Sequence, residues 1–333
     1  MQTVFPFDSG PANEVCREFL ERDMSGAQLP ASFRAYYLLR RLMPLPVRQF
    51  LQRRRSGAID VPPDWYLPLE YCDRLTAALP GDAGRSNRPW PNHAGFAFVL
   101  THDVETAEGL QLVRPVAEIE EELGFRSSWN IVPHKYPIDR GLIDDLRKRG
   151  FEIGIHGYNH DGRLFWSEST FRRRARHINA ALERFQAVGF RAPMAHRNLR
   201  WMQLLDIEYD SSCFDIDPFQ AMPGGIGSLW PVITGRFVEL PYTLPQDHTL
   251  FIGLGETTDR IWSDKLSLIK SWSGMALMLT HPDYLDTPQR RDLYRGFLTK
   301  VRDAGGYWHA LPRDVARWWR TGNSDDAIES VAS

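Results

Sequence analysis

Short apolar segments alternate with helical segments from residue 95 to residue 321, and this alternation limits the fold more than any other feature. Residues 95–101 (GFAFVLT) are apolar and end abruptly in charge, as expected of a strand buried on both faces. Residues 106–123 predict a helix, and Gly124 is placed to end it. The pattern continues with strands at 127–133, 151–157, 189–193, 207–212, 237–243, 275–281 and 306–311, and with helices at 141–150, 167–187, 287–306 and 312–321.

Strands that alternate with helices in this way indicate parallel βα units. Seven or eight units favour a closed or nearly closed barrel over an open sheet, so we expect an α/β protein with a distorted (β/α)7-type barrel. The barrel is expected over residues 91–320, after an N-terminal helical or irregular extension at 1–90 and before a flexible tail at 321–333. Residues 79–93 are dense in Gly, Pro, Asn and Ser, which indicates a linker or a lid.

The composition is that of an ordinary globular protein: 333 residues, 40 of them basic and 42 acidic, with a net charge of −2. Such a balance argues against a general nucleic-acid binder. No stretch approaches the ~20 apolar residues of a membrane-spanning helix, and the first residues lack the pattern of a signal peptide. We therefore expect a cytoplasmic protein. The widely spaced cysteines indicate a reducing compartment; they are Cys16, Cys72 and Cys213.

Polar residues cluster at the expected ends of the strands, where parallel βα folds build their active sites. Asp103 and Glu105 are two residues apart at the end of the first strand. If that strand continues, both carboxylates face one side and reach into one site. An aspartate that caps the following helix is an equally good interpretation of Asp103 alone. Further polar residues follow later strands: His156, His160, Arg191, Asp210, Asp247 and His281.

His156 and His160 are four residues apart directly after an expected strand. On a helical turn, two imidazoles with this spacing can share one metal ion. The pair alone is a weak signal, because such histidines also occur as surface or capping residues. Together with the carboxylates at a neighbouring strand end, it predicts a site with one carboxylate and two histidines that leaves coordination positions open for water and substrate.

These motifs resemble those of polysaccharide deacetylases of the NodB-homology type, carbohydrate esterase family 4. Residues 101–105 (THDVE) are similar to the family's TFDDGP motif, and residues 156–160 (HGYNH) to its H-S/T-x-x-H motif. The family's R-x-P motif matches residues 191–193, and its last motif matches residues 279–281 (LTH). The order and spacing of four motifs over residues 95–312 make the resemblance far more specific than any one motif.

The resemblance implies a set of roles at a divalent metal, with zinc as the expected ion. It assigns Glu105, His156 and His160 as metal ligands; Glu105 takes the acidic position because Val104 replaces the family's second aspartate. The metal would polarise an acetamide carbonyl and activate water. The resemblance implies further roles as follows: Asp103 as general base, Arg191 as its partner, His281 as proton donor to the leaving amine, the Met194 N–H as oxyanion donor, and Leu279 as a wall for the acetyl methyl group.

Two further residues are candidates for substrate contact. Asp247 is the best match to the family's fourth motif. Arg163 closely follows His160 and is placed to meet a phosphate or carboxylate of the substrate, although an ordinary loop salt bridge is the simpler interpretation.

Residues 32–55 carry seven arginines, no acidic residue and many interspersed aromatic and aliphatic residues. Pro44 and Pro46 are expected to split this segment into two short helices. The favoured interpretation is a helical hairpin whose apolar face packs on the barrel and whose arginines face water. The alternative is peripheral contact with the inner face of an anionic membrane.

The resemblance therefore implies a metal-dependent hydrolase that removes the N-acetyl group of an acetamido sugar in polysaccharide or glycoconjugate biosynthesis. A substrate linked to a nucleotide or a lipid suits a cytoplasmic enzyme. One alternative is an amide hydrolase that acts on a cyclic imide, a ureide or another small amide with the same scaffold. The other is a catalytically silent sugar-binding module without metal.

Overall fold

Strand β2 (Phe96–Val104) is the centre of the sheet in the computed structural model of the chain. It is buried along its whole length and extends three residues beyond the apolar run from which it was predicted. One edge of β2 pairs with β9 (Met275–Thr280). The other edge pairs with β10 (Tyr307–His309) near its start and with β3 (Ser127–Ile131) near its end, all in parallel. The structure describes residues 3–7, 10–25, 29, 31, 33, 35, 43–79 and 89–321.

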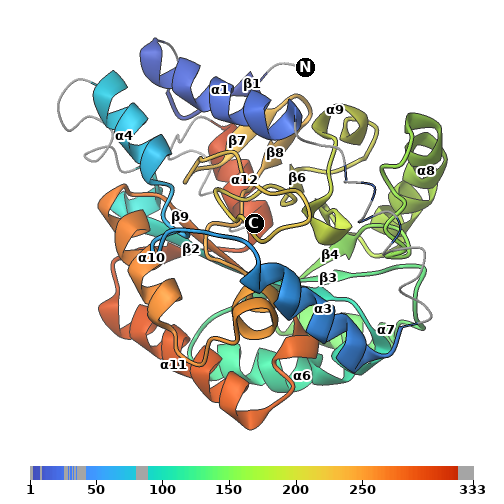
Figure 1. The fold of residues 1–333 in the computed structure, drawn as a ribbon. Coiled ribbons are helices and arrows are strands. Elements are labelled where there is room, and N and C mark those ends of the chain that lie inside the picture. The colour runs from blue at the N-terminus through green and yellow to red at the C-terminus, as the bar shows by residue number, and fades with distance from the viewer. Residues whose placement is uncertain are drawn as a thin grey trace.

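The sheet continues from β3 through further parallel strands and returns to β9. These strands are β4 (Glu152–His156), β5 (Gly189–Arg191), β6 (Tyr209–Asp210) and β8 (Phe237–Glu239). Beyond β8, the backbone N–H groups of Thr243 and Leu244 each donate to the carbonyl of Leu277 in β9 at 3.1 Å. The parallel strands thus form a nearly closed ring with the helices on its outside (Figure 1). The predicted distorted (β/α) barrel is confirmed.

Helices follow the strands as the periodicity predicted, and several begin with a side chain that caps the first turn. Thr106 caps α6, Asp139 caps α7, Ser167 caps α8 and Thr287 caps α11. Helix α10 was not predicted, because its sequence follows a long irregular stretch without strand signals. The helices of the barrel are α6 (Ala107–Glu122), α7 (Arg140–Lys148), α8 (Glu168–Arg184), α9 (Leu199–Met202), α10 (Arg260–Ser271), α11 (Pro288–Ala304) and α12 (Pro312–Arg320). Short 3-10 and π turns lie at η2 (Pro91–His93), η3 (Pro193–Ala195), η4 (His248–Leu254) and η5 (Pro282–Tyr284).

The N-terminal segment is joined to the barrel by a strand pairing and by a buried ion pair. Strand β1 (Thr3–Val4) pairs antiparallel with β7 (Val232–Thr234), so the segment adds a strand to the same sheet. Asp23 of α1 forms a buried ion pair with Arg197. Helices α1 (Pro11–Ser25), α3 (Leu45–Gly57) and α4 (Leu69–Ala78) complete the segment.

The hairpin expected at residues 32–55 is only partly described. Most of its first half lies outside the described residues, as do residues 80–88 of the expected linker and 322–333 of the expected tail. Pro44 is the N-cap of α3, so a helix begins directly after this proline, as expected of a segment that prolines interrupt. The expected direction of packing is wrong for α3, because Val47 and Phe50 are exposed whereas Arg55 is partly buried against the barrel. Within the described ranges, no helix combines the length and the apolarity needed to cross a bilayer.

Glu152 gives the barrel a pH-dependent stability. Its carboxylate is buried and accepts hydrogen bonds from the Tyr209 hydroxyl at 2.7 Å and the Arg313 N–H at 3.3 Å. Burial raises the pKa of Glu152 to about 7, although the bond from Tyr209 acts in the opposite direction. Because the folded-state pKa exceeds the unfolded one, the stability is present at low pH and is lost as pH rises toward 7.

We expect Glu152→Gln to remove this loss. The free energy of unfolding of the variant, relative to the natural chain, should increase by roughly 2 kcal/mol between pH 5 and pH 8. Chemical denaturation at the two pH values measures the difference. The exposed Glu183 provides the control, since Glu183→Gln should show no such change with pH. The prediction would be contradicted if the free energy of unfolding of Glu152→Gln differed from that of the natural chain by the same amount at both pH values.

Candidate metal centre and active site

Parallel pairing brings the polar ends of neighbouring strands to one edge of the barrel. Asp103 of β2 is paired with Asn130 of β3, and His156 of β4 is paired with Arg191 of β5. Since β2 runs to Val104, Asp103 and the following Glu105 lie on the same side, as alternation in an extended strand requires. The carboxyl ends of parallel strands therefore assemble one site from segments far apart in the sequence.

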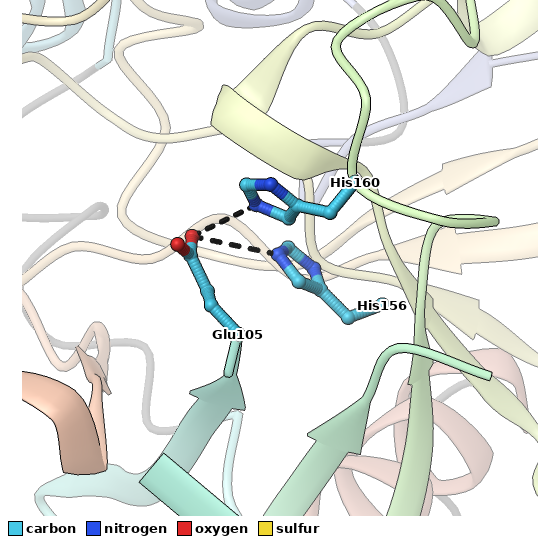
Figure 2. Close-up of side chains that lie close together, drawn as sticks. All are labelled: Glu105, His156 and His160. Carbon is cyan, nitrogen blue, oxygen red and sulfur yellow. Dashed lines mark hydrogen bonds and ion pairs between the residues drawn. The ribbon is translucent and has the colours of Figure 1, made fainter. Parts of the chain in front are cut away.

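Glu105, His156 and His160 meet at the centre of this site. Figure 2 shows the three side chains pointing toward one another, with Glu105 at the end of β2 and the imidazoles opposite. Oε1 of Glu105 lies 2.9 Å from Nε2 of His160 and 3.9 Å from Nε2 of His156. One donor atom from each residue lies within 4.8 Å of the other two. The three residues predicted as metal ligands are thus brought together.

The two histidines do not share a helical turn, so that part of the prediction is wrong. His156 ends β4, and the chain then turns through Gly157 at φ +64° and His160 at φ +56°. A left-handed backbone is free for glycine but costs energy at a histidine. Such strain is kept only where the surroundings enforce it, often at functional sites. This turn folds His160 back toward His156, with the ring centres 5.1 Å apart.

The cluster holds its members in the protonation states that metal binding needs. Burial lowers the pKa of His160 to about 4, although the neighbouring Glu105 acts in the opposite direction. Burial would raise the pKa of Glu105, but attraction to His160 and the hydrogen bond with its imidazole bring it well below its usual range. At neutral pH the site therefore presents an ionised carboxylate and a neutral His160 imidazole, the forms that bind metals.

His156 also fits a metal ligand. Its Nδ1–H donates to the backbone carbonyl of Arg191 at 3.1 Å, which leaves the lone pair on Nε2, the atom that faces Glu105. Nε2 is buried and has no hydrogen-bond partner among the described residues. A buried acceptor without a partner is costly, and a cation bound between the three residues would satisfy it. Two imidazoles and one carboxylate suit zinc and related divalent ions.

Asp103 lies beside the cluster as an almost fully buried carboxylate. Its Oδ1 accepts hydrogen bonds from Nη1 of Arg191 at 3.0 Å and from Nδ2 of Asn130 at 2.9 Å. Its Oδ2 lies 3.6 Å from Nδ1 of His156. Burial would raise the pKa of Asp103, but attraction to His156 and Arg191 lowers it below its usual value. Asp103 is therefore ionised and able to accept a proton.

Arg191 is fixed in place by its other donors. Its Nε donates to the carbonyl of Ser211 at 2.6 Å, and its Nη2 donates to the hydroxyls of Ser211 at 2.7 Å and Thr101 at 3.0 Å. The guanidinium is thus held rigidly against Asp103 in a buried ion pair. Breaking a buried pair from one side leaves an uncompensated charge, so Arg191 is a structural requirement for the ionised Asp103.

His281 faces the cluster from the end of β9, with Asp247 directly behind it. Nδ1 of His281 lies 2.7 Å from Oδ1 of Asp247, whose Oδ2 accepts the backbone N–H of His281 at 2.7 Å. Nε2 of His281 lies 3.8 Å from Glu105. Burial would lower the pKa of His281, but Asp247 and Glu105 raise it to about 9. His281 is therefore a cation at neutral pH. Asp247, predicted to contact substrate, is fully buried and instead orients His281.

A cavity of about 540 Å³ opens onto these residues. Leu279 and Met194 line it beside Asp103 and His281. Met194 has a left-handed backbone (φ +62°), which shows that this turn is built with strain at the edge of the cavity. The cavity has the size of a small-molecule site.

Arg163 does not line this cavity. Its side chain is exposed, and its guanidinium carbon lies 5.1 Å from the centre of the Trp166 ring. The neighbouring Asp161 is paired with Arg174. The structure therefore places Arg163 on the surface beside the site rather than in it.

Sequence reasoning missed the residues that support the site from behind. Asn130 and Ser211 contact Asp103 and Arg191, but neither belongs to a recognised motif. One signal was present for Asn130, because it is an amide in the middle of a buried strand. Gly154 on the next strand makes room for it, since a Cβ there would meet Asn130 Oδ1 at 2.0 Å.

Gly157 is expected to be essential for the turn between the two histidines. A Cβ at this position would lie 2.5 Å from Cγ of Pro193, and its φ of +64° is left-handed. We expect Gly157→Ser to cost about 1–2 kcal/mol of stability from the backbone alone, and more from the clash. Gly124 has a similar φ and open space around it, so Gly124→Ser isolates the backbone cost. Equal losses in the two variants, measured by denaturation, would contradict the role of the clash.

Comparison with solved structures identifies the fold. A proposed polysaccharide deacetylase from Mycobacterium smegmatis matches 70% of this chain and 92% of its own length, with a TM-score of 0.57 and 22% identity. A proposed polysaccharide deacetylase from Pseudomonas aeruginosa PAO1 matches 74% and 98%, with a TM-score of 0.57 and 15% identity. The chain has the polysaccharide deacetylase fold. Puue allantoinase shares this fold too, matching 80% of this chain and all of its own at a TM-score of 0.55 and 16% identity.

No family model matches the sequence, and no curated protein matches it. The likeness is therefore one of structure, and it agrees with the fold that the sequence motifs implied.

Proposed function

We propose that the protein is a metal-dependent hydrolase that removes the N-acetyl group from an acetamido sugar in polysaccharide or glycoconjugate biosynthesis. One observation carries the proposal. An ionised aspartate paired with an arginine and a cationic histidine backed by an aspartate flank the same three-residue cluster, at one cavity. Amide hydrolysis uses a general base and a general acid, and here the surroundings move the pKa values of the two groups apart.

Glu105, His156 and His160 would hold the divalent ion, for which zinc is the best candidate. When bound, the ion supplies Lewis-acid polarisation of the acetamide carbonyl. Three protein ligands would leave coordination positions open for water and substrate, and Glu105 and His160 line the cavity.

The proton transfers are assigned to Asp103 and His281. Asp103 accepts the proton of the attacking water, because Arg191 and Asn130 hold its carboxylate ionised and fixed in orientation. His281 donates a proton to the departing amine, because Asp247 keeps its imidazole protonated at neutral pH. The products are acetate and a free amino sugar.

The wall of the cavity suits a small acyl group. Leu279 is an apolar surface close to His281, so it can contact the acetyl methyl group. The N–H of Met194, in the strained turn at the cavity edge, is assigned to the oxyanion that develops on the carbonyl. A volume of about 540 Å³ accommodates a sugar with part of its neighbouring group.

A ring-opening amidohydrolase is the second candidate, since the named allantoinase shares the fold at a similar TM-score. Allantoin is a cyclic ureide, and opening its ring is also the hydrolysis of an amide bond. The fold therefore does not separate the two reactions, and substrate assays must do so.

The decisive experiment measures acetate release from free, nucleotide-linked and lipid-linked acetamido sugars, beside ring opening of cyclic imides and ureides. The zinc-loaded full-length protein is used. We expect acetate from at least one acetamido sugar and no ring opening. Ring opening without acetate release would replace the proposal by the second candidate. Protein that binds no metal and hydrolyses neither class would be a silent sugar-binding module.

A further inference from the structure

Helix α3 exposes apolar residues to solvent, together with two of its arginines. Val47, Phe50 and Leu51 are 44%, 62% and 39% exposed, respectively. Their spacing of three and four residues places them on one face of the helix. Ser56 is buried on the opposite side, and Arg55, four residues after Leu51, reaches the barrel. A surface helix of a soluble protein normally has the opposite arrangement.

This apolar face, defined by Val47, Phe50 and Leu51, is unusual within the part of the chain that the structure describes. The other large hydrophobic residues exposed to a similar degree are Leu69 at 40% and Leu204 at 38%, which lie on other elements. Single exposed hydrophobic residues are ordinary, but a contiguous group marks a contact surface.

The charges of α3 identify the kind of surface that it fits. Arg54 is exposed on the same face, four residues after Phe50, Arg53 is exposed at the edge of that face, and Arg48 is half-buried. The helix has no acidic residue, although the whole chain carries a net charge of −2. An apolar stripe flanked by arginines matches a bilayer with anionic headgroups, where the side chains enter the acyl boundary and the guanidinium groups meet phosphates.

The same helix forms one wall of the catalytic cavity. Leu51 and Gln52 line the cavity that contains Asp103 and His281. Arg55 anchors α3 there, because its Nη1 and Nη2 donate to the carbonyls of Phe219 and Gln220 at 2.7 and 2.8 Å. In Figure 1, α3 lies across the face of the barrel, next to η4.

Leu51 connects the two features. It belongs both to the apolar face and to the wall of the cavity, so apolar surface continues from the outside of α3 to the cavity. An amphiphilic substrate fits this arrangement, with its sugar in the cavity and its lipid chain along α3.

We propose that α3 docks on an anionic bilayer and presents the cavity to an acetamido sugar carried on a lipid. The docking itself is independent of the reaction, whereas the identity of the substrate rests on the proposed deacetylation.

Flotation tests the docking without any assay of activity. The full chain is mixed with phosphatidylcholine vesicles with or without phosphatidylglycerol. We expect binding only to the phosphatidylglycerol vesicles, and a marked decrease at high salt. The double variant Val47→Ser/Phe50→Ser should bind at least about tenfold more weakly, because membrane binding scales with buried apolar area.

Leu204→Ser is the control, since it removes another exposed hydrophobic side chain, 38% exposed and far from α3 in the sequence. It should float like the natural chain, and both variants should unfold at the natural temperature because the replaced side chains are exposed. No flotation with phosphatidylglycerol, or equal flotation of the double variant, overturns the proposal. A dimer in solution that the double variant dissociates would also overturn it, by assigning the apolar face to a second copy.

Activity on two substrates separates this proposal from the proposed function. The double variant should lose at least about tenfold in activity on a lipid-linked acetamido sugar in vesicles, and retain activity on a water-soluble one. Equal activity of the natural chain and the variant on the vesicle substrate overturns the inference and leaves the deacetylase intact. No acetate from either substrate contradicts the proposed function, while flotation still decides the docking.

Discussion

Glu105→Gln should abolish stoichiometric metal binding and lower the rate of acetate release at least about a thousandfold. Glu105 is the only anion among the three clustered residues, and its Oε1 lies 2.9 Å from Nε2 of His160 and 3.9 Å from Nε2 of His156. Glutamine keeps the shape of the side chain but removes the charge that holds a divalent ion. The lost Lewis acid accounts for several kcal/mol of transition-state stabilisation, and each 1.36 kcal/mol is about tenfold in rate.

Metal content after dialysis, measured by elemental analysis, and the rate of acetate release are compared in the variant and the natural protein. Glu108→Gln is the matched control, because Glu108 lies three residues further on and is exposed in the first turn of α6. The control should bind metal and turn over normally. A Glu105→Gln protein that retains one metal ion per chain would show that Glu105 is not a ligand.

Most of the barrel could be predicted because the residues of each strand show by themselves that the strand is buried. Strands such as β2 and β9 are buried on both faces, so each appears as an apolar run that ends at a polar cluster. Strands β1 and β7 could not be predicted. They are two and three residues long, and their pairing depends on contacts between distant segments.

The members of the site could be recognised from the sequence, but not their geometry. The spacing of His156 and His160 indicated a helical turn, whereas the chain makes a loop with left-handed residues that is held by tertiary contacts such as the hydrogen bond from the Gly157 N–H to the Arg191 carbonyl. Asp247 shows the same limit. It was identified as a site residue, but its position behind His281 depends on how η4 packs beside β9.

The orientation of α3 could not be derived from periodicity. Residues 45–57 mix apolar and basic side chains at spacings of three and four, so the pattern does not show which face meets the barrel. Burial of the apolar face was the simpler expectation, since it removes hydrocarbon from water. In the structure, hydrogen bonds from Arg55 to the carbonyls of Phe219 and Gln220 hold α3 on the barrel while Val47 and Phe50 stay exposed.

Asp247→Asn should lower kcat by roughly a hundredfold or more through His281, with a smaller effect on KM. Asp247 accepts from both Nδ1 and the backbone N–H of His281, so it fixes the tautomer and the direction of the ring. Asparagine can accept one of these bonds, and its amide nitrogen then faces the other donor. It also removes the charge that opposes the effect of burial on the imidazole.

The pH profile separates this electrostatic role from a loss of structure. Asp247 contributes most to raising the pKa of His281 to about 9, against the effect of burial, which lowers it. Without that charge the pKa falls, so the imidazole loses its proton at a lower pH. The basic limb of kcat/KM should therefore move to lower pH in Asp247→Asn. The exposed Asp286, in the turn that follows His281, provides the control, and Asp286→Asn should leave both kcat and the limb unchanged. A basic limb that stays in place while kcat falls would assign the proton donor to a residue other than His281.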